Sequence, residues 1–139
     1  CTGICFSDSV TEEEKAYALK MFSCIGKAQE VPEKLMDVVV GVSGSSPAYV
    51  FVMIESMADA AVSGGMPRAQ AYRFAAQAVL GSAKMVLETN EHPGKLKDAV
   101  CSPAGSTIEG VNALENGSFR ADVMNAVDKS YKRTVELGK

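Results

Sequence analysis

The sequence predicts a mainly α-helical protein with about six helices, preceded by a short β-α-β unit. Beyond residue 32, apolar residues recur every three or four positions, which is the helical period. The chain has no Trp, and aromatic residues make up only 6% of it. Its core must therefore depend on small or flexible side chains, which suit close helix packing better than sheet packing. Its 139 residues are enough for one domain, or for one domain and part of another.

The first thirty residues differ from the rest and predict the β-α-β unit. Thr2–Phe6 has strand character. The pattern Thr11-x-x-Glu14 is a capping box that marks the start of a helix, and Gly26 is the expected stop. Lys27–Val31 is a second candidate strand. A unit of this size is too small to fold alone, so we interpret it as the end of an α/β domain.

We therefore divide the chain into residues 1–31 and a helical domain at 32–139. Proline-containing or glycine-containing segments separate the helices, and the break at Ser43–Pro47 is predicted to place Ser46 as a cap and Pro47 in the first turn. The helix after this break is apolar on nearly all sides, so we expect surroundings that include a second subunit, with Tyr49 and Phe51 in the core. The predicted helices cover residues 33–42, 47–63, 68–88, 96–100, 107–116 and 119–137.

Composition argues against several classes of protein. The net charge of −3 and the pI of about 5.2 disfavour nucleic acid as a main partner. Four cysteines without a Cys-x-x-Cys pair, together with a single His, predict no zinc site and fit reduced thiols of a cytoplasmic protein. The longest apolar run, Ala48–Ile54, is far shorter than the roughly 20 residues of a membrane-spanning helix.

The segment Cys101–Thr107 is the best candidate site. A proline and small residues lead directly into a predicted helix, whose first N–H groups have no intrahelical partner and carry partial positive charge. Gly105 lets a ligand approach the backbone, and Ser106-x-x-Glu109 is a second predicted capping box. Such a segment can bind a small carboxylate or phosphate. On these residues alone, an ordinary capped loop is the alternative.

Several segments, in order and at matching spacing, closely resemble the pyrroline-5-carboxylate reductase family. The resemblance spans nearly the whole chain. The matching segments are Cys101-Ser102-Pro103-Ala104-Gly105-Ser106-Thr107-Ile108, Leu114-Glu115, Gly117-Ser118-Phe119-Arg120, Leu35-Met36-Asp37, Ser43-Gly44-Ser45-Ser46-Pro47-Ala48-Tyr49-Val50-Phe51, Gly65-Met66-Pro67-Arg68, Gly81-Ser82-Ala83-Lys84-Met85, Glu91-His92-Pro93-Gly94 and Leu96-Lys97-Asp98.

This resemblance implies an enzyme that reduces 1-pyrroline-5-carboxylate to L-proline with NADPH or NADH, the last step of proline biosynthesis. Residues 1–31 would then be the end of a Rossmann-type dinucleotide-binding domain, and 32–139 a dimerisation and substrate-binding domain. Homodimers, which can assemble into larger rings, are also implied. By the same resemblance, Thr107 faces the ring nitrogen as the catalytic residue. The substrate carboxylate would be held by Ser102, Ala104, Gly105, Ser106 and Thr107.

The chain departs from the family pattern in four ways. Ser46 and Ala104 stand where Gly is usual, and Ala99 replaces a common Asn, which leaves any contact of that Asn in question. The Gly-x-Gly-x-x-Gly run that binds a dinucleotide is absent. We therefore expect a fragment that is inactive alone. Alternatives are the helical domain of a related dehydrogenase acting on another small carboxylate, or a non-enzymatic helical interaction module.

Other chemically suggestive residues have simpler interpretations. His92, beside Pro93, is predicted to be a turn residue rather than a catalytic acid. Cys101 has no base near it in the sequence that would activate a nucleophile. Glu55 and Asp59 lie one helical turn apart and are predicted to mark an exposed or interfacial face.

Overall fold

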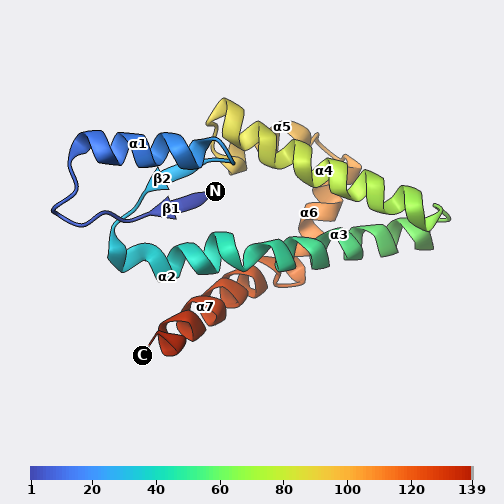
Figure 1. Ribbon diagram of the computed structural model, residues 1–139. Helices are drawn as coiled ribbons and strands as arrows, with labels where there is room; N and C mark the ends of the chain where they lie inside the picture. The colour runs from blue at the N-terminus through green and yellow to red at the C-terminus, as the bar shows by residue number, and fades with distance from the viewer. Residues whose placement is uncertain (139) are drawn as a thin grey trace. The chain divides into compact units, whose positions relative to one another are not determined.

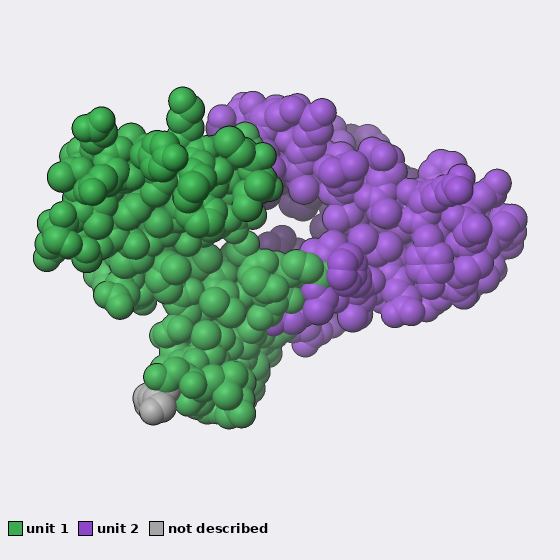
Figure 2. Space-filling view, viewed as in Figure 1, with its two compact units in different colours: residues 1–47, 124–139 green, residues 48–123 purple. Residues whose placement is uncertain are grey.

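A computed structural model describes residues 1–138, which form two compact units (Figures 1 and 2). The first unit consists of residues 1–47 and 124–139, and the second of residues 48–123. Most of the chain is helical, and six α-helices (α2–α7) follow residue 32 within the described part, as the sequence predicts.

The first unit begins with the predicted β-α-β arrangement. Strands β1 (Thr2–Ile4) and β2 (Ala28–Glu30) are parallel, with Thr2 opposite Ala28, and α1 (Glu12–Ser23) connects them. The capping box at the start of α1 is confirmed, because the Thr11 hydroxyl accepts from the Glu14 N–H at 3.3 Å and the Glu14 carboxylate accepts from the Thr11 N–H at 2.9 Å. The predicted stop at Gly26 is wrong, since α1 ends at Ser23 with Cys24 as its C-cap.

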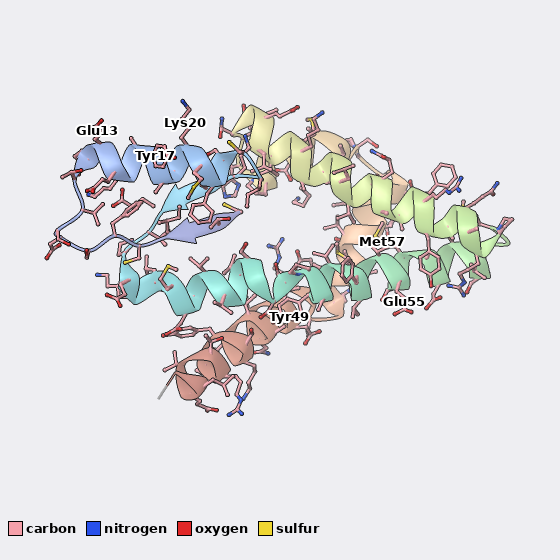
Figure 3. All side chains as sticks on the ribbon, viewed as in Figure 1. Glu13, Tyr17, Lys20, Tyr49, Glu55 and Met57 are labelled. Atoms are coloured by element: carbon pink, nitrogen blue, oxygen red, sulfur yellow. The ribbon has the colours of Figure 1, made fainter. Side chains whose placement is uncertain are left out.

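The two sides of the small sheet are covered by different helices. Helix α1 lies over one side and α2 (Met36–Val39) over the other (Figure 1). A Cβ added to Gly3 of β1 would meet Val39 Cγ1 of α2 at 3.2 Å, so the strand and helix are closely packed. On α1, Lys20 projects away from the sheet (Figure 3), and Tyr17 is exposed.

The predicted break at Ser43–Pro47 is wrong. A short 3-10 turn at Glu33–Leu35 leads into α2, which continues through the π-helical segment Val40–Gly44 into α3 (Ser46–Ser63). Ser46 is therefore the first residue of α3 rather than its cap, while Pro47 lies in the first turn of this helix, as predicted. The Ser45 N–H donates to the Val40 carbonyl at 2.8 Å, an i→i−5 bond that lets the chain stay helical through residues that are typical of a loop.

Close packing against the last helix accompanies this π-helical segment. A Cβ on Gly41 would lie 3.2 Å from the Val127 carbonyl oxygen and 3.3 Å from the Cβ of Tyr131, both in α7 (Phe119–Leu137). The Ser130 hydroxyl also lies 2.7 Å from that of Ser45. A side chain at position 41 would crowd the α7 backbone, so the two helices are closely packed here.

The second unit is built on α3 and α4 (Arg68–Thr89), which form a helical hairpin. Its buried apolar side chains are all alanines: Ala58 of α3, and Ala71 and Ala75 of α4. Small side chains allow helices to approach closely. Arg68 closes the hairpin through an ion pair with Asp59, and its guanidinium lies 5.6 Å from the centre of the Tyr72 ring.

Two shorter helices complete the second unit. Helix α5 (Pro93–Val100) begins three residues before the predicted start, and α6 (Ser106–Asn116) follows the candidate loop. Ser118 has a φ of 66° at the junction with α7, and the Arg120 Nε donates to the Glu115 carboxylate at 2.7 Å across that junction. The loop between α5 and α6 is therefore held between two short, exposed helices.

Large apolar side chains remain exposed on α3 and α4. Phe51 is 67% exposed, which contradicts its predicted place in the core, while Tyr49 is half-buried. By length and apolar composition alone, the helical run Glu33–Ser63 could cross a membrane. The sequence prediction of no such span was based on the short apolar run Ala48–Ile54, whereas the helical run in the structure covers 31 residues.

Candidate functional site

The candidate loop contains a tight turn at Ser102-Pro103-Ala104-Gly105. The Gly105 N–H donates to the Ser102 carbonyl at 3.0 Å, which closes the turn. Proline at the second position and a φ of 56° for Ala104 at the third are the features of a type II turn. That third position favours glycine, because a Cβ in the left-handed region crowds the backbone. Ala104 is therefore strained where a glycine would be relaxed.

Gly105 is required by a close approach within the same turn. A Cβ at this position would lie 3.1 Å from the Ser102 carbonyl oxygen and 3.6 Å from the Ser102 Cβ, and closer still to the Ser102 hydroxyl. The turn thus folds Ser102 back over the start of α6. This contact brings the first predicted site residue, Ser102, beside the later ones in the segment.

Helix α6 begins one residue earlier than predicted. Gly105 is its N-cap, with extended backbone, and no side chain caps the helix. The predicted Ser106–Glu109 capping box is therefore wrong, because the turn at 102–105 already places Ser106 in the first helical position. The N–H groups of the first helical residues, Ser106, Thr107 and Ile108, have no intrahelical acceptor and carry the positive end of the helix dipole.

The predicted site residues thus meet at one end of α6. Ser102, Ser106 and Thr107 are exposed, and Gly105 is half-buried. Three hydroxyls, free N–H groups and a partial positive charge lie together around a turn only four residues long. An arrangement of this kind can hold a small anion and offer a hydroxyl donor beside it.

Two charged residues of α5 that precede the loop, Lys97 and Asp98, are paired. Lys97 donates to Asp98 at 2.5 Å, and this hydrogen bond, with the charge of Asp98, raises the pKa of Lys97. Cys101, which caps the C-terminal end of α5, is half-buried and not in a disulfide. Among residues 1–138, no three His, Cys, Asp or Glu side chains are placed to hold a metal ion. An anion at the loop would therefore depend on backbone N–H groups and hydroxyls.

The remaining suggestive residues have structural roles. His92 is the N-cap of α5 rather than a turn residue, since its Nδ1 accepts from the Gly94 N–H at 3.0 Å. Glu55 and Asp59 are exposed, as predicted, and Asp59 is engaged by Arg68. The hydrogen bond from Arg68 to Asp59 raises the pKa of the guanidinium further.

Apolar grooves on α3 and α4 were not singled out from the sequence. One groove of about 720 Å³ lies along α4, lined by residues that include Phe74 and Leu80, and another of about 420 Å³ lies between α3 and α4 and includes Met57. Glu55 and Met57 project from different sides of α3 (Figure 3). The sequence gives no signal that these apolar residues are exposed, because a helix with a buried face has the same apolar spacing. Only the packing in the structure shows their exposure.

Comparison with known proteins agrees with this description. The family described as pyrroline-5-carboxylate reductase dimerisation matches residues 33–137. Pyrroline-5-carboxylate reductase of Escherichia coli strain K12 is 62% identical over 130 residues, which are 94% of this chain and 48% of that protein. The Methanosarcina acetivorans reductase is 54% identical over 138 residues, covering 99% of this chain and 51% of that protein.

Solved structures give the same result. A pyrroline-5-carboxylate reductase from Coxiella burnetii superposes with a TM-score of 0.94 at 31% identity, covering 99% of this chain and 51% of that one. Plasmodium falciparum pyrroline carboxylate reductase with NADP bound gives a TM-score of 0.86 at 34% identity, covering 99% and 53%. The chain spans about half the length of the curated relatives it matches.

The fold and the loop define the class of protein: a helical domain that follows a short β-α-β unit. Many of the larger apolar side chains of this helical domain remain exposed. The match over residues 33–137 then gives the particular family: the chain belongs to the pyrroline-5-carboxylate reductases, through their dimerisation domain.

Proposed function

We propose that this chain is the substrate-binding and dimerisation part of an enzyme that reduces 1-pyrroline-5-carboxylate to L-proline. The observation that carries the proposal is the turn at Ser102–Gly105, which leads directly into the first turn of α6, where no side chain caps the helix. The relatives named above are pyrroline-5-carboxylate reductases at 62% and 54% identity. We further propose residue 32 as the start of the helical domain, since the family match begins at residue 33.

At this site the substrate carboxylate would accept hydrogen bonds from the N–H groups at the start of α6 and from Ser102. The Thr107 hydroxyl, in the first turn of the helix, would donate to the ring nitrogen. A donor at that nitrogen polarises the C=N bond and supplies a path for the proton that the nitrogen gains. Because the turn holds these groups in place before binding, little reorganisation is needed during the reaction.

The reducing cofactor in this proposal is NADPH or NADH, and a P. falciparum relative has been solved with NADP bound. The residues of this chain do not fit such a cofactor, because no Gly-x-Gly-x-x-Gly run connects a strand to a helix. The role proposed for these 139 residues is therefore to bind and polarise the substrate. We expect no NADPH oxidation by the chain alone.

A second copy of this chain is the proposed partner for the apolar surfaces of α3 and α4. Burial of apolar area is the main driving force for association, and Phe51, Phe74 and Leu80 are each at least 60% exposed. A membrane fits these surfaces less well, because Arg73, Gln70 and Gln77 line the same groove as Phe74. We propose a cytoplasmic homodimer, which can build larger rings, without membrane or nucleic-acid partners.

The site is tested by thermal unfolding of the chain with increasing L-proline, with other small carboxylates compared in parallel. A ligand that binds only the folded state raises the midpoint. We expect protection by proline, loss of that protection in Thr107→Val, and normal protection in Thr134→Val, which removes a hydroxyl from α7 instead. Equal protection by every carboxylate would favour a dehydrogenase acting on another substrate, and no protection by any would contradict the proposed site.

A further inference from the structure

Arg120 connects the end of α6 to the first turn of α7. Its Nε donates to both oxygens of the Glu115 carboxylate, at 2.7 and 3.0 Å. Between the two residues the chain turns at Gly117 and at Ser118, which has a φ of 66°. Ion pairs on a helix surface ordinarily join residues three or four apart within one helix. This pair joins two helices instead, so it limits the angle between α6 and the start of α7.

The charges of this pair oppose the dipoles of both helices. Glu115 lies in the last turn of α6, at the negative end of that helix, and Arg120 lies in the first turn of α7, at its positive end. Each charge is therefore unfavourable for its own helix. The stability of either helix does not explain the pair, whereas a connection between the two helices does. Local rules broken in this way are expected at functional positions.

Little of α6 is buried, so packing does little to hold its direction. None of its 11 residues is buried, and only Ile108 and Val111 are half-buried. The helix is about 16 Å long, so a tilt of about 10° at its C-terminal end would move its first residue by roughly 3 Å. Ser106 and Thr107 of the proposed site are its first two residues. Functional groups must be held within about 0.5 Å of their productive positions, so the direction of α6 decides whether the site can bind.

The helix on the other side of the loop reaches the same place. Lys97 of α5 and Arg120 line one hollow of about 280 Å³, whose walls come from α5, α6 and the start of α7. Its lining residues are Lys97, Val111, Leu114, Glu115, Phe119 and Arg120. Lys97 pairs with Asp98, which leaves the Glu115 carboxylate to Arg120. The two helices that carry the ends of the loop thus meet at the hollow that contains the Glu115–Arg120 pair.

We propose that Arg120 is a positioning residue for the substrate loop. Through Glu115 it holds α6 in the direction that brings the hydroxyls and N–H groups of Ser102–Thr107 to the substrate carboxylate. This inference rests on the proposed function. An exposed ion pair contributes little to global stability, and the side chains of Arg120 and Glu115 are 68% and 46% exposed. Loss of Arg120 should therefore weaken substrate binding while the unfolding midpoint changes little.

Calorimetric titration of the 139-residue chain with L-proline tests the proposal, with the unfolding midpoint of each variant measured without ligand. Arg120→Met should lower proline affinity about two- to fivefold, the range expected for one exposed ion pair. Arg133→Met is the matched control, because Arg133 is 65% exposed and donates to Glu136 at 2.9 Å within α7. This control should leave both the affinity and the midpoint unchanged.

A double-mutant cycle tests whether Arg120 acts through Glu115. Arg120→Met, Glu115→Met and the double variant should lose about the same affinity, because each of them removes the same ion pair. Losses that multiply in the double variant would overturn the proposal. So would an unchanged affinity in Arg120→Met, an equal loss in Arg133→Met, or a loss of affinity that only accompanies a lowered midpoint, which is the result of a purely structural role.

Hydrogen exchange at the Gly105 N–H separates this test from that of the proposed function. This N–H donates to the Ser102 carbonyl, and Gly105 is the N-cap of α6, so any freedom of α6 passes directly to the turn. Its protection should fall in Arg120→Met but not in Arg133→Met, and unchanged protection would overturn the proposal. If the wild-type chain binds no proline, the proposed function fails, while exchange at Gly105 still decides whether Arg120 orders the loop.

Discussion

Replacing Ala104 by glycine should stabilise the protein. Ala104 occupies the third position of the turn with a φ of 56°, in the left-handed region that glycine adopts without penalty. No other alanine in residues 1–138 has a positive φ. The substitution removes one methyl group from an exposed residue, so little packing is lost.

The expected gain follows from two opposing terms. A non-glycine residue in this region costs about 1–2 kcal/mol. Glycine gives the unfolded chain more freedom, which costs about 0.4–1 kcal/mol. The difference is a stabilisation of about 1 kcal/mol, or a midpoint raised by roughly 3–5 °C for a chain of this length.

Thermal and urea unfolding of Ala104→Gly measure this gain, with Ala113→Gly as the matched control. Ala113 is exposed in the middle of α6, so glycine there should destabilise by about 0.5–1 kcal/mol. The two substitutions are chemically identical and should change stability in opposite directions. A destabilised Ala104→Gly, with a loss similar to that of Ala113→Gly, would refute the conformational argument.

Three further predictions concern the loop, α1 and the apolar surface. Gly105→Ala should lower the stability by about 1–3 kcal/mol, because the added methyl group crowds Ser102. Gly26→Ala, at a position with open space around it, should change the midpoint of thermal unfolding little. Similar midpoints for the two variants would contradict the close approach at Gly105. Hydrogen bonds from the backbone N–H and the hydroxyl of Thr11 lower the pKa of Glu14. The stability that these bonds contribute is therefore present above the ordinary carboxylate range, and it is lost as the pH falls through the lowered pKa. Glu14→Gln should remove that part of the acid transition followed by circular dichroism, and an unchanged transition would count against the capping box. Phe74→Glu should convert the proposed dimer to monomers in sedimentation, whereas an equivalent charge on the exposed face of α1 should not; a dimeric Phe74→Glu would exclude this groove from the interface.

Features encoded by neighbouring residues could be predicted from the sequence. The capping box at Thr11 was correct because the hydrogen bonds join residues only three apart. The helix that follows Pro67 was correct over nearly its full length, since proline and the apolar period mark it locally. The end of α1 was misplaced because Gly26 follows a helix that had already ended at Ser23.

Errors arose where distant residues decide the conformation. Ser43–Pro47 has the composition of a loop, yet it stays helical where Gly41 packs against the backbone of α7 and Ser45 meets Ser130. At the candidate site, Ser106 was predicted to cap α6, but the turn closed by Ser102 gives that place to Gly105.

The sequence by itself determined the helical class, most helix boundaries and the residues of the candidate loop, because these depend on period, capping and turn chemistry within a few positions. Only the tertiary structure decided that Ala104 is left-handed, that His92 caps the helix before the loop, and that Phe51 is exposed. The physical reason is that backbone strain and burial depend on where the rest of the chain lies. Apolar residues spaced for a core leave the same pattern in the sequence whether the chain covers them itself or leaves them open to another surface.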